Sequence, residues 1–419
     1  MIATFTIGTP AASEWMDALR ARREQAFDAA RDAAAKVARE VREGGDAAVA
    51  SIVARVDGAR LAPDALSIEP RRKDIDPALS AAADLAIARI RSYHERQVAP
   101  ERPRAGELVE RVRPLRRVAV YVPGGRAVYL STLIMGAVPA LLAGVEEIVV
   151  LTTPAAAATP ELGEIAARLG IRAIYRGGGA GIAAAAYGTA SLPAVDKIVG
   201  PGSQFVTALK QYLYGRVGID MTAGPSEIAV IADESAEPEL VAADLLAQSE
   251  HGPDSAAVAV VIGSAFAPAL RAAIERRAAQ LPSDAIARRS LGDNGAIAIA
   301  RTAAEGVAFV NALAPEHVSV QVRDADAIIA GIENSGAIFV GRFSPVAIGD
   351  YTAGPNHILP TAGGGRFFSP LGVKDFLKSA HVVALSRETF AAAAPAAEIL
   401  ALREGLPLHA ASIAAREGR

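Results

Sequence analysis

The chain contains no cysteine among its 419 residues. This absence excludes disulfide bonds, a cysteine nucleophile and any zinc site built from thiolates. A zinc ion in this protein would need nitrogen and oxygen ligands, which are more typical of a catalytic site than of a structural one.

Aromatic residues, charge of one sign and long apolar runs are scarce as well. Aromatic residues make up 5% of the chain and the net charge is −3, so neither stacking platforms nor a basic nucleic-acid surface is expected. The longest apolar run, residues 133–145, is interrupted by glycine and proline and is too short to span a bilayer. The N-terminus lacks the pattern of a signal peptide. We therefore expect a cytoplasmic protein that binds neither nucleic acid nor membrane.

The pattern of apolar residues predicts an α/β fold. Helical spacing over residues 15–56 and 78–97 is followed by apolar strands that alternate with helices. The expected strands lie at 118–122, 147–152, 172–175 and 196–199, and then at 227–232, 256–262, 296–300, 318–322 and 337–340. Such alternation is typical of parallel βαβ units.

We therefore predict two Rossmann-like, doubly wound modules of similar rhythm, with a helical N-terminal segment and a helical C-terminal tail. The predicted domains are residues 1–120 with 227–370, residues 121–226 on the cofactor side, and the tail 371–419.

Histidine is rare, and its placement is informative. Four of the six histidines lie in polar, turn-rich clusters beside a carboxylate or an amide: His251, His317, His357 and His409. Histidine beside acid can hold a divalent metal and can move protons near neutral pH, which indicates a metalloenzyme. The other two, His94 on a helix surface and His381 in an apolar segment, are expected to be structural.

Two of these clusters have a local geometry that can be predicted. Gln248 and His251 are three residues apart at the end of a predicted helix, so they share a face and can converge on a metal. A surface pair at a fraying helix end is the alternative. Glu316 and His317 are adjacent in an extended segment and point in opposite directions, which fits two separate proton-transfer roles. An exposed loop pair is the alternative there.

The remaining polar residues lie in loops and in the tail. Residues 349–361 contain two glycines and two prolines and present Asp350, Asn356 and His357, as rigid catalytic loops do. Glu404 and His409 do not share a helix face, and a solvated tail is the alternative for them.

Glycine-rich turns at 123–125, 177–179 and 200–202 each follow a strand, where backbone amides can hold phosphate groups. None of them matches the dinucleotide fingerprint GxGxxG. Ser226 lies in a further turn and could meet a ligand.

Seven segments, read in order, resemble the histidinol dehydrogenase family, whose members depend on zinc and NAD. They are residues 121–125, 199–202, 220–233, 244–252, 314–317, 344–361 and 404–409. The resemblance runs from about residue 15 to the C-terminus. It departs from the family pattern at Ala180 and Ser203, where the family has amides, and in an opening that lacks the family's short strand before the first helix.

The resemblance implies a role for each matching residue. Zinc ligands would be Gln248, His251, Asp350 and His409. The acid–base pair would be Glu316 and His317. Substrate contacts would be Ser226, His357, Glu404, His317 and the four zinc ligands. NAD contacts would fall on Tyr121, Ala180 and Ser203. In the family the tail crosses a homodimer, so Glu404 and His409 would complete the neighbouring subunit's site.

The implied activity is the oxidation of L-histidinol to L-histidine through histidinal, with two NAD, as the last step of histidine biosynthesis. A related zinc dehydrogenase of another polar alcohol, such as an amino or sulfonated diol, is the main alternative. A zinc hydrolase or a silent metal-holding protein would differ in binding no NAD.

Overall fold

The computed structural model describes residues 2–98, 106–125 and 127–417. The chain forms two compact units, one made of Met1–Val98 and Leu115–Phe376, the other of Ala99–Pro114 and Leu377–Arg419.

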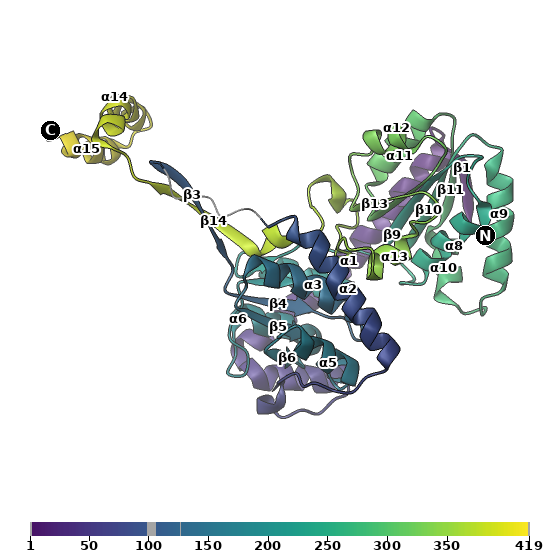
Figure 1. The fold of residues 1–419 in the computed structure, drawn as a ribbon, viewed down its shortest axis with the longest axis horizontal. Helices are drawn as coiled ribbons and strands as arrows, with labels where there is room; N and C mark the ends of the chain where they lie inside the picture. Colours follow the sequence, from purple (N-terminus) through teal and green to yellow (C-terminus); the bar gives the residue numbers. More distant parts are fainter. Residues whose placement is uncertain (1, 99–105, 126, 418–419) are drawn as a thin grey trace. The chain divides into compact units, whose positions relative to one another are not determined.

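The larger unit contains two six-stranded sheets with corresponding strand orders (Figure 1). The first sheet has the order β2 (Ser67–Ile68), β6 (Ala173–Tyr175), β5 (Glu147–Leu151), β4 (Arg117–Tyr121), β7 (Lys197–Val199), β8 (Gly218–Ile219). The second has the order β1 (Ala3–Thr6), β11 (Ala296–Ala300), β10 (Ala256–Ile262), β9 (Glu227–Ala232), β12 (His317–Gln321), β13 (Ala337–Val340). Within the described residues, β2 pairs antiparallel with β6 and the other pairs of both sheets are parallel.

In each sheet an edge strand, β2 or β1, comes first in the chain; the βαβ series then starts at a central strand, β4 or β9, winds outward to one side, and returns to build the other side. This is the doubly wound pattern, so the predicted Rossmann-like modules are confirmed. The domain limits at residues 120, 226 and 370 remain a proposal.

Apolar residues face both sides of each sheet, as parallel sheets require. Helices α1 (Pro10–Val56), α6 (Gly181–Tyr187) and α7 (Gln204–Leu213) cover one face of the first sheet, and α2 (Pro77–Glu95), α3 (Leu130–Ala143) and α5 (Pro160–Arg168) cover the other. The second sheet is covered by α8 (Pro238–Ser249), α9 (Phe266–Ala279) and α10 (Ile286–Asn294) on one face, and by α11 (Ala303–Leu313) and α12 (Ala325–Gly331) on the other. Short α4 (Pro154–Ala157) and α13 (Val346–Tyr351) complete the larger unit's α-helices among the described residues.

The N-terminal region corrects two expectations. A strand does precede the first helix, because β1 pairs in parallel with β11 at the edge of the second sheet. His94 is fully buried and not on a helix surface, and its Nδ1 lies 2.9 Å from Gln97 Oε1. The long α1 continues to Val56 across a break at Gly45, whose φ of 55° is left-handed.

The smaller unit begins as a two-stranded ribbon. Strand β3 (Leu108–Pro114) pairs antiparallel with β14 (Leu377–Val383), and Figure 1 shows this ribbon leading to α14 (Arg387–Arg403) and α15 (Pro407–Ala414). The expectation of a purely helical tail was therefore wrong at its start, and His381 is an exposed residue of β14. None of the helices in the described ranges is both long and apolar enough to cross a membrane.

Candidate active site

The predicted acid–base pair and the predicted metal ligands of the larger unit gather at the amino-terminal edge of the second sheet. His317 is the first residue of β12, Glu316 directly precedes it, and Ser226 directly precedes β9. Helix α8 runs back toward this edge after β9, so its last turn brings Gln248 and the following His251 there. The topology of the βαβ unit therefore assembles residues that lie far apart in sequence.

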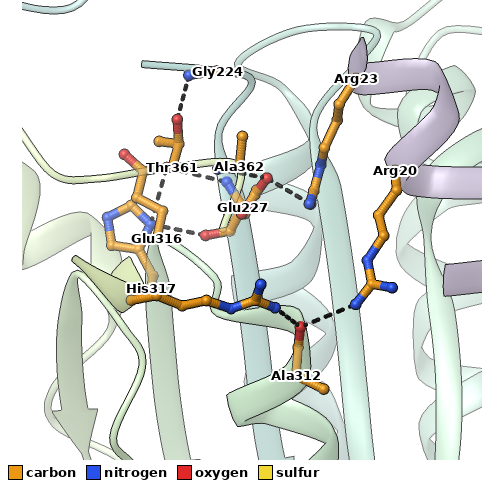
Figure 2. A network of polar contacts seen from close by, with 10 residues as sticks. Arg20, Arg23, Gly224, Glu227, Ala312, Glu316, His317, Thr361 and Ala362 are labelled. Carbon is orange, nitrogen blue, oxygen red and sulfur yellow. Dashed lines mark hydrogen bonds and ion pairs between the residues drawn. The ribbon is translucent and has the colours of Figure 1, made fainter. Parts of the chain in front are cut away.

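Glu316 and His317 are buried, with exposures of 7% and 3%, which rules out the exposed loop pair. Both are held by the backbone of Glu227, the first residue of β9 (Figure 2). The Glu227 N–H donates to Glu316 Oε2 over 3.1 Å, and His317 Nδ1 donates to the Glu227 carbonyl over 3.0 Å. Glu227 was not among the predicted site residues, although an acidic residue at the start of an apolar buried strand is a signal for one.

Burial shifts the pKa of both side chains away from their usual ranges. It raises the pKa of Glu316 well above its ordinary value, and the charges of Glu227 and Asp350 raise it further. It lowers the pKa of His317 to about 3, so this imidazole is neutral near pH 7. Because its Nδ1–H is bound by a carbonyl, the lone pair of His317 lies on Nε2. That atom is buried without a hydrogen-bond partner among the described residues and lies 3.9 Å from Asp350 Oδ1.

The three predicted metal ligands of the larger unit have the chemistry of a cation site. Gln248 is 3% exposed, and its Nε2 has no hydrogen-bond partner in the described part of the chain. Rotation of the amide would present the oxygen at the same place. Burial raises the pKa of Asp350 to about 7, so the site contains a poorly solvated carboxylate, and partial desolvation lowers the pKa of His251, whose side chain is exposed. These are groups that a divalent ion would stabilise.

The described histidine and carboxylate side chains do not by themselves form a group of three or more that could hold a metal ion. Of the four predicted ligands, the larger unit supplies one histidine, one carboxylate and one amide. The donor set fits zinc, but it needs a further ligand.

Asp350 lies in α13, and the loop that follows this helix is fastened to α3. His357 Nδ1 donates to the Asp350 carbonyl over 3.0 Å, and its Nε2 lies 3.1 Å from Thr132 Oγ1. Asn356 Nδ2 donates to the Met135 carbonyl over 2.7 Å. Both ring nitrogens of His357 are thus engaged within the protein, so the structure gives it a positioning role. Its contact with substrate remains a prediction.

A cavity of about 110 Å³ joins this edge to the first sheet. Ser226, Glu316 and His357 line it on one side, and the glycine turn 200–202 after β7 lines it on the other. Gly200 is required in that turn, because its φ is 114° and a Cβ would lie 2.3 Å from the Tyr121 carbonyl oxygen. The cavity therefore connects the amino edge of one sheet with the carboxyl edge of the other.

The predicted NAD contacts share that carboxyl edge. Tyr121 ends β4, Ala180 follows β6, and Ser203 follows β7. Burial raises the pKa of Tyr121 to about 12, so its phenol stays protonated. Ser203 is the N-cap of α7, where its Oγ accepts the Val206 N–H over 3.4 Å. Serine thus performs the capping that an asparagine would perform there.

A second cavity, of about 430 Å³, lies beside the turns that follow β4 and β5. Gly124, Gly125 and Thr153 line it, together with Asp57 at the end of α1. A Cβ on Gly178 would lie 2.5 Å from Asp57 Oδ2, so the glycine turn 177–179 reaches the same carboxylate. Asp57 was not predicted, because nothing in a helix-ending Asp-Gly pair indicates a ligand.

Glu404 and His409 lie in the smaller unit. Glu404 ends α14, His409 is in α15, and both are exposed.

Two Rossmann-like modules that share a buried acid and a neutral histidine have the architecture of a dinucleotide-dependent oxidoreductase. The fold alone is shared with an acetylating aldehyde dehydrogenase from Geobacillus thermoglucosidasius, at a TM-score of 0.51 and 15% identity over 90% of this chain and 97% of that one.

The family is identified by sequence. The model of the family described as histidinol dehydrogenase matches residues 20–417. Histidinol dehydrogenase of Cereibacter sphaeroides is 44% identical over 91% of this chain and 90% of its own length, and that of Bacillus subtilis is 43% identical over 91% of each. The chain belongs to the histidinol dehydrogenase family, which is a family of NAD-dependent oxidoreductases, and the resemblance stated from its motifs is confirmed. The structure of the Elizabethkingia anophelis histidinol dehydrogenase matches with a TM-score of 0.87 at 29% identity, over 100% of this chain and 98% of that one.

Proposed function

We propose that this protein oxidises L-histidinol to L-histidine in two hydride transfers to NAD. The observation that carries the proposal is the free, buried Nε2 of neutral His317 beside the buried Glu316 carboxyl, next to a cavity lined by the Gly200 turn. A base and an acid at such a cavity suit the removal of two protons from a substrate that also loses two hydrides.

In the first oxidation, His317 Nε2 accepts the proton of the substrate hydroxyl while hydride leaves the same carbon for the nicotinamide. The products are the aldehyde, NADH and protonated His317. The Glu227 carbonyl would stabilise the imidazolium through its bond to Nδ1–H, at 3.0 Å in the structure. Because burial disfavours this charge, the proton would leave the site readily.

In the second oxidation, Glu316 accepts a proton from water as the water adds to the aldehyde carbon. The resulting hydrate anion loses hydride to a second NAD to give the carboxylic acid, which releases its remaining hydroxyl proton to solvent and becomes the carboxylate. The high pKa of Glu316 makes its ionised form a stronger base than an exposed carboxylate. Glu404 would offer a carboxylate to the ammonium group of the substrate.

Gln248, His251 and Asp350 would hold a zinc ion with His409. When bound, zinc would supply a fixed positive charge that orients the imidazole and amine of the substrate. Ser226 and His357 would line the space beside it, while Tyr121, Ala180 and Ser203 would border the NAD.

The proposed fourth zinc ligand, His409, belongs to the smaller unit and implies a homodimer. His409 and Glu404 are exposed in a small unit whose apolar side chains are also exposed, including Leu402 at 58%, Ile399 at 62% and Leu408 at 82%. We propose that this unit is covered by a second copy of the chain, so that each copy completes the other's site.

The test counts NADH formed by the zinc-loaded protein for each L-histidinol consumed. Two NADH with histidine as the product support the proposal. One NADH with aldehyde accumulation would contradict the second step, and no turnover by a zinc-bound dimer would point to another polar alcohol.

A further inference from the structure

Glu227 is a buried acidic residue to which the proposed reaction assigns no step. Its own peptide groups hold both proton-transfer residues, with the N–H bound to Glu316 Oε2 at 3.1 Å and the carbonyl bound to His317 Nδ1 at 3.0 Å. One residue therefore sets the orientation of the carboxyl group and of the imidazole. Any shift of the Glu227 backbone would therefore disturb both contacts.

The side chain of Glu227 is fixed by elements outside its own sheet strand. Its Oε1 lies 2.5 Å from Arg23 Nη2 of α1 and accepts the Ala362 N–H over 3.2 Å (Figure 2). The side chains of Arg23 and Glu227 are 13% and 2% exposed. Burial raises the pKa of Glu227, and the charge of Arg23 opposes that rise. A buried ion pair contributes little net stability, so stability alone does not explain why Arg23 and Glu227 are paired here.

The backbone around this pair is also unusual. Among the described residues, Ala314 and Ala362 are the non-glycine residues with a left-handed backbone, at φ values of 46° and 53°. Ala314 lies two residues before Glu316, and Ala362 is the residue that donates to Glu227. Such conformations cost free energy and persist where surrounding structure enforces them, as around functional sites.

We propose that Arg23 and Glu227 are a positioning pair for the reaction. Arg23 fixes the Glu227 carboxylate, and the fixed carboxylate holds the Glu227 backbone in the position from which its N–H and its carbonyl align Glu316 and His317. Neither residue touches the reacting atoms. The inference rests on the roles proposed above for Glu316 and His317.

The first experiment needs no substrate. Protein labelled with nitrogen-15 in histidine is examined by NMR, and His317 is assigned by comparison with His317→Asn. In the native chain, His317 should be neutral with its proton on Nδ1. In Glu227→Gln and Arg23→Met this single form should give way to a mixture of tautomers, and Arg23→Lys should largely restore it.

The second experiment compares kinetics where histidinol is oxidised. Both substitutions should lower kcat about tenfold and change KM less than twofold, because the substrate keeps its contacts while proton transfer is misaligned. The double variant should be no slower than the slower single variant, since the two residues act through one contact. Arg31→Met is the matched control, because Arg31 is an exposed residue of the same helix whose ion-pair partner among the described residues is Asp28, at 3.4 Å. It should behave as wild type in both experiments.

A His317 signal and a kcat unchanged by either substitution would overturn the inference. Equal losses in kcat and in substrate affinity, with the tautomer intact, would also overturn it and indicate a structural role only. If the wild type does not oxidise histidinol, the proposed substrate fails while the tautomer measurement still decides the positioning role.

Discussion

The two sheets of the larger unit have the same winding but use opposite edges. The first sheet presents its glycine turns and the second cavity at the carboxyl ends of its strands, as doubly wound sheets ordinarily do. The second sheet places Ser226, Glu227, Glu316 and His317 at the amino ends of β9 and β12. The site therefore combines the carboxyl edge of the first sheet, which contributes backbone groups, with the amino edge of the second sheet, which contributes side chains.

The difference lies in what each edge can do. Glycine turns allow a ligand to approach backbone amides closely, and they bring no ionisable side chain of their own. The amino edge of the second sheet instead buries carboxyl and imidazole groups, and burial shifts the pKa of each of them. The doubly wound topology thus determines which sheet edges a ligand can reach. The side chains at the strand ends determine which edge can transfer protons.

The largest effect should come from removing the base at the amino edge. His317→Asn should reduce oxidation of histidinol about 10³-fold, because proton removal by a positioned base contributes 10² to 10⁴. The measurement is the first-turnover formation of NADH. Aldehyde supplied directly should be oxidised with a smaller loss, and an equal loss in both half-reactions would refute the separate role of His317.

Glu316→Gln should mainly impair the second half-reaction, by about 10²-fold, because water addition then lacks its base. Single-turnover assays with histidinol and with histidinal separate the two steps. A variant that oxidises histidinal normally would contradict the role of Glu316.

The amino edge should also bind zinc in a pH-dependent manner. Since burial raises the pKa of Asp350 to about 7, protons compete with the metal below that pH. Zinc affinity should fall about tenfold for each unit below pH 7, as measured by competition with a chelator. The sign follows because metal binds only the ionised carboxylate. An affinity that does not change between pH 7 and 6 would show that Asp350 is not a ligand.

The smallest effect should come from the carboxyl edge. Asp57→Ala should raise KM for NAD several-fold with little change in kcat, because the Asp57 carboxylate lines the second cavity, where it could bind ribose hydroxyl groups. Relative use of NADP should increase as a negative charge is removed. Asp64→Ala, an exposed acidic residue nearby in sequence, is the control. Unchanged KM values would show that NAD does not bind in the second cavity.

The sequence predicted the sheets well because their strands are apolar runs of ordinary length. The limits expected for β9, β10, β11 and β13 match the structure. It failed on β1, β2, β3, β8 and β14, since short or exposed edge strands carry little apolar signal.

The site was predicted in part for the same physical reasons. Histidine and acid beside turns identified Glu316, His317 and Asp350. Glu227 and Arg23 were not predicted as site residues, because their roles depend on a contact between residues 204 positions apart and on backbone groups that every residue has.

The ribbon of β3 and β14 joins chain segments that are synthesised at very different times. Pro114 leaves the ribosome long before its partner Leu377 exists, so β3 has no strand to pair with for tens of seconds at ordinary rates of synthesis. The two sheets can fold during that wait, and the ribbon with its two helices must form last. A chain that stops early would therefore release a well-folded larger unit that lacks His409, and quality control that recognises unfolded protein would not detect the defect.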